Sequence, residues 1–165
     1  MKFAETELRQ ITEDTWKIVL GEDLTPRAPA VAPAEIDDPI AACAQIVGDW
    51  HVAAVLYCSM TLAVRAAAMM FDTTPEKATP EDIQDTMCEL INIIAGNVKG
   101  VLSGSSFLSL ANVAKGSDFK LRFPRHVLLS DVTFESRGEL LLVRLLGEDR
   151  AGAEIESAGS HRTDP

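Results

Sequence analysis

The sequence is poor in positive charge and has no long uninterrupted apolar run. Its 165 residues carry 25 acidic and 15 basic side chains, a formal net charge of −10. Nucleic-acid and anionic-membrane partners require clustered Lys and Arg, so we expect neither. Residues 52–70 are apolar but are interrupted by polar groups that include Arg65, whereas a bilayer span needs about 20 mostly apolar residues. The chain turns acidic at Glu5, unlike a secretory signal, and we expect a cytoplasmic protein.

Cysteine and histidine are also scarce. The three cysteines have neither the spacing of a zinc site nor the density of a disulfide framework. A bridge between Cys43 and Cys58 across a hairpin is conceivable, but free buried thiols are favoured. The three histidines have no partner ligands three or four residues away. We therefore expect no metal centre and no intrinsic cofactor.

Hydrophobic spacing and turn residues divide the chain into short elements of one domain, predicted over residues 1–147. Residues 148–165 have few large apolar side chains and are expected to be a disordered tail. The predicted elements are, in order, a helix over 3–20, an extended Pro/Ala-rich surface connection over 24–39, a buried hairpin of strands 41–48 and 51–58, a helix from Ser59 or Thr61 to about Phe71, a polar loop over 72–79, a long helix from Pro80 to about Leu102, and strands over 107–113, 119–123, 127–135 and 139–146.

Runs of strands surround two central helices, and repeated βαβ alternation is absent. This pattern predicts an α+β fold in which a largely antiparallel sheet packs with a long central helix and additional helices.

The long helix has the clearest start signal in the chain. Thr79 can cap it, Pro80 suits the first helical position, and acidic residues follow at the positive end of the helix dipole. At 100° per residue the helix has an apolar face and a polar stripe. The apolar face comprises Ile83, Met87, Leu90, Ile94, Val98 and Val101, and the polar stripe comprises Asp82, Asp85, Glu89, Asn92, Gly96, Lys99, Gly100 and Ser103.

A polar stripe on such a helix is most often its solvated side. Two features argue for more than solvation. Gly96 and Gly100 each cost about 1 kcal/mol relative to alanine in a helix interior, so a closely packed strand or another chain is expected there. Asn97 is predicted to lie toward the core side and to hydrogen-bond the backbone of an adjacent element.

The segment Asp85-Thr-Met-Cys-Glu89-Leu-Ile-Asn92-Ile-Ile-Ala-Gly96-Asn97 resembles the Asp/Ser-x-x-x-Glu-x-x-Asn signature, followed by Gly-Asn, of the CheC/CheX/FliY chemotaxis phosphatases. It is most similar to the single-site CheX branch. The hairpin at 46–49 and Leu108-Ser109-Leu110 stand in the same order as in that family. Two departures are Ala111, where the family commonly has proline, and a hairpin connection that lacks a second glycine.

The resemblance implies hydrolysis of the aspartyl phosphate of a CheY-like response regulator. Glu89 would pair with a regulator lysine, Asn92 would orient the attacking water, and Asp85, Gly96 and Asn97 would support them. The regulator would bring its own Mg²⁺, and the CheX branch implies a homodimer. An acyl phosphate is already activated, so positioning water is the main task, and an amide can both accept from water and donate to phosphoryl oxygen.

Two other interpretations remain open. The chain could be a non-catalytic regulator-binding or scaffold domain on the same fold. Alternatively, Asp85 and Glu89 could be the acid/base pair of an unrelated hydrolase, although no nucleophile or metal motif accompanies them. Residues 72–89 hold six acids against Lys77 alone, which suggests a negative surface that steers a lysine-bearing, metal-loaded regulator.

Overall fold

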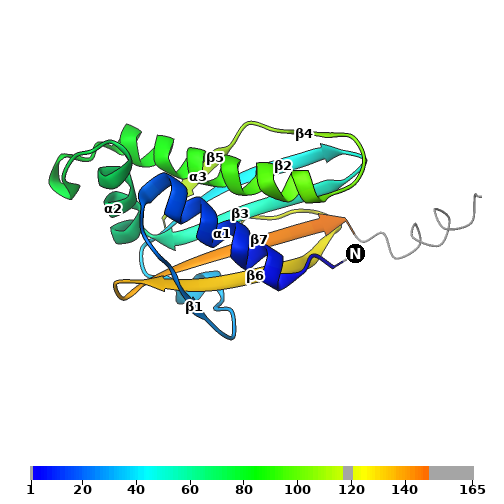
Figure 1. Cartoon of the computed structure of the whole chain (residues 1–165), viewed down its shortest axis with the longest axis horizontal. Coiled ribbons are helices and arrows are strands. Elements are labelled where there is room, and N and C mark those ends of the chain that lie inside the picture. Colours follow the sequence, from blue (N-terminus) through cyan, green and yellow to red (C-terminus); the bar gives the residue numbers. More distant parts are fainter. Residues whose placement is uncertain (1, 117–120, 149–165) are drawn as a thin grey trace, which may run out of the picture.

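The computed structural model describes residues 2–116 and 121–148. In this part of the chain three α-helices cover one face of an antiparallel sheet (Figure 1). The helices are α1 (Glu5–Leu20), α2 (Met60–Met70) and α3 (Pro80–Val101). The strands are β1 (Thr25–Arg27), β2 (Pro39–Gly48), β3 (His51–Ser59), β4 (Ser106–Leu108), β5 (Asn112–Lys115), β6 (His126–Ser136) and β7 (Glu139–Glu148). The predicted α+β class is confirmed.

The sheet is built from two long hairpins that lie side by side. Its strand order is β1-β6-β7-β3-β2-β4, and β5 also pairs with β2. The β2–β3 hairpin matches the one predicted from the apolar runs, with Gln45 opposite Ala53. In the β6–β7 turn, Arg137 and Gly138 both have positive φ, as a tight hairpin turn requires. Both hairpins are therefore defined by signals local in the sequence.

The main hydrophobic core lies between the helices and the sheet. The helix α3 packs on β2 and β3 and α1 packs on β6, while α2 lies at one end of the sheet (Figure 1). Trp16, Leu90 and Phe134 are among the fully buried side chains of this core. The apolar helix α2 begins as predicted at Ser59, whose hydroxyl accepts from the Leu62 N–H at 3.2 Å. This core holds α3 rigidly against the sheet.

The opposite face of the sheet is also covered, which corrects the interpretation of residues 24–39 as an extended surface connection. This segment contains β1, which pairs with β6, and a 3₁₀ turn at Pro33–Glu35. Val31 and Ile36 are buried against the sheet, and the Val31 N–H donates to the Thr133 hydroxyl at 3.0 Å. The sequence did not predict the burial of Val31 and Ile36, because each stands alone among prolines and alanines and is buried only by the face of a distant sheet.

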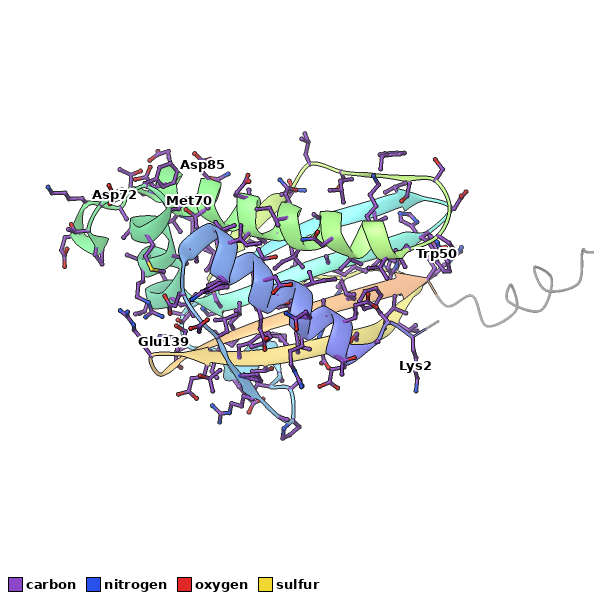
Figure 2. All side chains as sticks on the ribbon, in the orientation of Figure 1. Lys2, Trp50, Met70, Asp72, Asp85 and Glu139 are labelled. Carbon is purple, nitrogen blue, oxygen red and sulfur yellow. The ribbon has the colours of Figure 1, made fainter. Side chains whose placement is uncertain are left out.

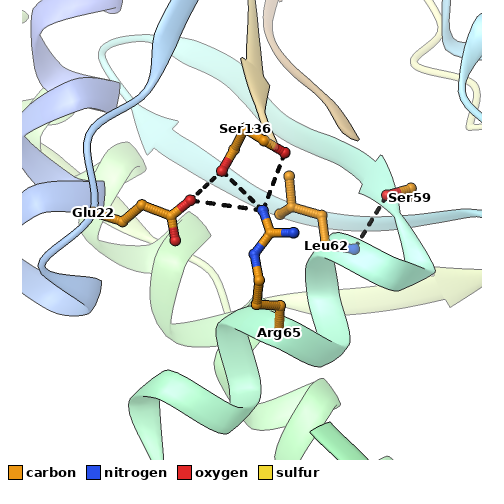
Figure 3. A network of polar contacts seen from close by, with 5 residues as sticks. All are labelled: Glu22, Ser59, Leu62, Arg65 and Ser136. Carbon is orange, nitrogen blue, oxygen red and sulfur yellow. Dashed lines mark hydrogen bonds and ion pairs between the residues drawn. The ribbon is translucent and has the colours of Figure 1, made fainter. Parts of the chain in front are cut away.

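A polar cluster ties α2 to the β6–β7 hairpin (Figure 3). The Arg65 guanidinium donates to the Ser136 carbonyl at 3.1 Å and to its hydroxyl at 2.8 Å. Arg65 also pairs with Glu22 at 3.6 Å, and the Ser136 hydroxyl donates to Glu22. The Arg65 and Glu22 side chains are only 17% and 14% exposed. The one charge of the otherwise apolar helix α2 is thus paired.

Several predicted strand boundaries are wrong. The strand expected over residues 107–113 is divided into β4 and β5, because at Ser109 both the N–H and the hydroxyl bond to Gln45 and the chain bulges outward at Leu110. Residues 121–123 form no strand, and 117–120 lie outside the described residues. The strand β7 continues to Glu148, the first residue of the predicted tail; the rest of that tail, residues 149–165, lies outside the described residues.

Two further findings concern thiols and membranes. Cys43 and Cys58 are free and belong to the cores on opposite faces of the sheet, so the hairpin does not bring their thiols together. Among the helices described, none combines the length and the apolarity that crossing a bilayer would need.

Candidate functional site

The helix α3 begins as its sequence predicts. The Thr79 hydroxyl accepts from the Asp82 N–H at 3.1 Å, and the Asp82 carboxylate accepts from the Thr79 N–H at 3.1 Å. This reciprocal cap, with Pro80 in the first turn, satisfies amide donors that the helix itself leaves unpaired. The cap fixes the start of α3 and therefore the direction in which its polar stripe faces.

The outward stripe of α3 carries the candidate site residues. Asp85 and Glu89 are exposed, while Asn92 and Gly96 are partly buried. The buried side chains of the helix are Thr86, Met87, Leu90, Ile91, Ile94, Ala95 and Val98. One helical turn separates Glu89 from Asn92, a rise of about 4.5 Å along the axis. Within residues 2–116 and 121–148 neither side chain makes a hydrogen bond or ion pair, so both are available to a partner.

Two residues of α3 lie elsewhere than predicted. Asn97 is exposed rather than turned toward the core, although Thr86, at a similar angle nearer the start of α3, is buried. Val101, expected on the apolar face, is 47% exposed at the last turn of the helix. The predicted structural hydrogen bond of Asn97 is therefore wrong.

The two glycines of the stripe are not required by packing within the described chain. A Cβ at Gly96 would lie 3.8 Å from the Leu108 Cδ1 atom, an ordinary contact, and a Cβ at Gly100 would have no neighbour within 4 Å. The strand β4 reaches Gly96 through Leu108, but it does not approach closely enough to require a glycine there. The backbone of α3 is left open beside a shallow groove of about 440 Å³, whose lining includes Lys99.

The loop after α3 is fastened to the β2–β3 turn. The Asp49 carboxylate accepts from the Ser105 N–H at 2.7 Å, and the Trp50 indole donates to the Ser103 carbonyl at 2.5 Å. Gly48 has a φ of +144°, and a Cβ there would lie 2.5 Å from the Ser105 carbonyl oxygen. This close approach requires glycine at position 48. It anchors the far end of the helix that carries Glu89 and Asn92.

Negative charge gathers at the opposite end of the stripe. Asp72 and Asp85 lie at the same end of the molecule, beside Met70 at the end of α2 (Figure 2). Partial burial raises the pKa of the Cys88 thiol, and the neighbouring Asp85 charge raises it further. Cys88 therefore stays protonated at neutral pH and is a poor nucleophile. Within the described residues no group of three or more His, Cys, Asp and Glu side chains is placed to hold a metal ion.

Comparison with known families matches residues 40–135, more than half of the chain, to the chemotaxis phosphatase CheX family. The chain belongs to the CheX family. The matched region includes the β2–β3 hairpin and all of α3, together with the outward stripe that carries Glu89 and Asn92. The suspected relationship to the CheC/CheX/FliY phosphatases is thereby confirmed.

Solved structures agree on the fold. CheX from Vibrio vulnificus is 16% identical with a TM-score of 0.71, and the match covers 87% of this chain and 95% of that one. A CheX-CheY-BeF3-Mg²⁺ complex from Borrelia burgdorferi gives 16% identity, a TM-score of 0.72 and coverage of 87% and 97%. FliY from Thermotoga maritima gives 15% identity, a TM-score of 0.59 and coverage of 94% and 97%. Comparison with curated proteins found no match. At these identities the CheX and FliY structures establish the architecture alone.

Proposed function

We propose that this CheX-family chain hydrolyses the aspartyl phosphate of a CheY-like response regulator. Membership of a family of chemotaxis phosphatases supports the reaction class. The observation that carries the proposal is the placement of Glu89 and Asn92 one turn apart on the outward stripe of α3. The solved complex of the Borrelia burgdorferi CheX with CheY, BeF3 and Mg²⁺ supports a regulator as the partner.

In this mechanism Asn92 positions a water molecule. Its carbonyl oxygen accepts from the water while its amide donates to a phosphoryl oxygen, so the water lies in line with the phosphorus–oxygen bond that breaks. The regulator supplies the divalent metal that neutralises the phosphoryl charge. The contribution of α3 is orientation, and a rigid, capped helix holds the amide without further rearrangement.

Glu89 docks the regulator. It is exposed and, among the described residues, it has no competing cation, so it can pair with a lysine on the partner. Asp85 adds negative charge one turn earlier. Gly96 lets the main chain of the partner approach the helix backbone closely, which accounts for a glycine that packing within the described chain does not require.

The test is the lifetime of a phosphorylated regulator mixed with the purified protein. The proposal predicts that the wild type shortens this lifetime and that Asn92→Ala does not. A non-catalytic binding domain on the same fold would instead bind the phosphorylated regulator and leave its decay rate unchanged. Measuring binding and decay on the same samples separates these two functions.

A further inference from the structure

A second cavity lies on the face of the sheet opposite the helices. Its volume is about 660 Å³, larger than the groove beside α3. Strands β3 and β7 form its floor through Tyr57 and Arg144, and the segment around Ile36 forms one wall. Small-molecule sites typically enclose about 300–1,000 Å³. The cavity therefore has the size of a ligand site, and no step of the proposed phosphatase reaction uses it.

Arg144 places a positive charge in the floor of this cavity. It projects from the middle of β7, opposite Val55 on one side and Asp131 on the other. Its side chain is 24% exposed, and a guanidinium nitrogen donates to the Asp131 carboxylate at 3.4 Å. At 3.4 Å this contact is long for a hydrogen bond, so the terminal guanidinium nitrogens keep the capacity to donate to a second acceptor.

Tyr57 provides a second donor beside Arg144. It pairs across the strands with Leu142, two residues from Arg144 along β7, and is 7% exposed. Burial raises the pKa of its hydroxyl, while the Arg144 charge lowers it. The hydroxyl therefore stays protonated at neutral pH and can donate a hydrogen bond. Two donors from adjacent strands thus line the floor of the cavity.

The rest of the cavity lining is apolar beside these donors and charged at the rim. Ile36 and Leu121 line the cavity, together with Arg122. Asp37 and Asp38 also line it, but both are exposed, so water screens their charges. Arg144 and its partner Asp131 are equally exposed, at 24%, and electrostatic interactions there are stronger than at the rim. An anionic head group on the floor would therefore share the guanidinium with Asp131.

We propose that this cavity binds a small amphipathic anion, whose carboxylate or phosphate head accepts hydrogen bonds from Arg144 and Tyr57 while its apolar body lies against Ile36 and Leu121. The site is independent of the α3 stripe. Binding there adds a second acceptor to a guanidinium that contacts the Asp131 carboxylate at 3.4 Å.

Octanoate and 1-octanol form a matched pair of probes, since both have eight carbons and only octanoate is charged. Tyr57 is the one tyrosine of the sequence, so protein labelled with ¹³C-tyrosine gives a single ring signal set from the cavity floor. We expect octanoate to shift this signal saturably and to bind at least about tenfold more tightly than 1-octanol. Octyl phosphate serves as a third probe and distinguishes a phosphate head from a carboxylate.

Variants assign the binding to the two donors. Arg144→Met keeps an unbranched apolar stem, removes the guanidinium, and is expected to weaken octanoate binding about tenfold while leaving 1-octanol unchanged. Tyr57→Phe removes only the hydroxyl and is expected to weaken octanoate severalfold by calorimetry. Arg137→Met, at the exposed β6–β7 turn, is the control and should bind as the wild type does.

Three results would overturn the proposal. They are equal affinities for octanoate and 1-octanol, no saturable shift at millimolar octanoate or octyl phosphate, and unchanged octanoate affinity in a folded Arg144→Met variant. If Arg144→Met fails to fold, the decision passes to Tyr57→Phe, for which wild-type octanoate affinity refutes the assignment. None of these measurements involves a regulator, so failure of the proposed phosphatase activity leaves them unaffected.

Discussion

Replacing Gly96 with alanine should stabilise the fold and weaken regulator docking. An alanine in a helix interior is about 1 kcal/mol better than glycine. The added methyl would meet the Leu108 Cδ1 atom at 3.8 Å, a contact without strain. We therefore expect the free energy of unfolding to rise by about 0.5–1 kcal/mol and Tm by about 1–4 °C. The same methyl would obstruct a partner main chain lying on α3, costing about 1–2 kcal/mol, or roughly five- to thirtyfold in affinity.

The assay pairs urea unfolding with titration of a phosphorylated regulator. Gln84→Ala is the matched control, because Gln84 is exposed on α3 but lies off the outward stripe; its docking should match that of the wild type. A Gly96→Ala variant that gains stability and keeps wild-type docking would refute the role given to the glycine. A Gly96→Ala variant that loses stability would show that the helix face at position 96 has no room for a methyl group.

Three further predictions test docking, the polar cluster and the buried thiols. In a phosphate-release assay, Glu89→Gln should raise the half-saturating regulator concentration about tenfold, weaken the salt dependence of that concentration and largely keep the maximal rate. A loss confined to the maximal rate would contradict this role. Arg65→Met leaves the Glu22 carboxylate without its cation and should lower the free energy of urea unfolding by about 2 kcal/mol. Adding Glu22→Leu to this variant should restore part of that loss. If the losses of the two single variants simply add in the double variant, the pairing is contradicted. Burial raises the pKa of Cys58 from 9.0 to about 12 and that of Cys43 to about 11, so above about pH 9 each buried thiol lowers the free energy of unfolding by about 1.4 kcal/mol per pH unit, whereas below pH 9 its contribution is complete. Between about pH 8 and pH 10.5 the free energy of unfolding of Cys58→Ala should therefore fall less than that of the wild type. Equal losses would show that the pKa of Cys58 is unshifted.

Elements with local signals were predictable from the sequence. The start of α3 follows from Thr79 and Asp82, whose side chains satisfy each other's backbone N–H groups, and from Pro80 in the first helical position. The β6–β7 hairpin follows similarly from Arg137 and Gly138, whose backbone makes the turn. The outward position of Glu89 and Asn92 is a consequence of helical periodicity once the start of the helix is fixed.

Features set by distant contacts were not predictable. Val31 and Ile36 are isolated among prolines and alanines, and only the finished sheet gives them a surface to cover. The interruption between β4 and β5 depends on Ser109 bonding to Gln45, 64 residues earlier. The exposure of Asn97 was not predictable from periodicity, because a helical wheel gives only the angle of a residue. The neighbouring elements decide how much of the helix surface at that angle is covered.

The acidic segment and the site form one surface. The six acids of residues 72–89 lead into the stripe that carries Glu89, while Lys99 lies beyond Asn92 toward the other end of the helix. The stripe is thus negative at its start and positive near its end. In the proposed docking, a regulator that presents a lysine to Glu89 and an acidic group to Lys99 would be held in one orientation.

The most direct test of the account is single-turnover decay of a phosphorylated CheY-like regulator with the protein in excess. The wild type and the Gln84→Ala control should shorten the phosphate lifetime equally. Asn92→Ala should bind the regulator and leave its decay at the intrinsic rate, because the helix still docks but no longer orients water. Decay with Asn92→Ala as fast as with the wild type would contradict the assignment of Asn92 as the catalytic residue.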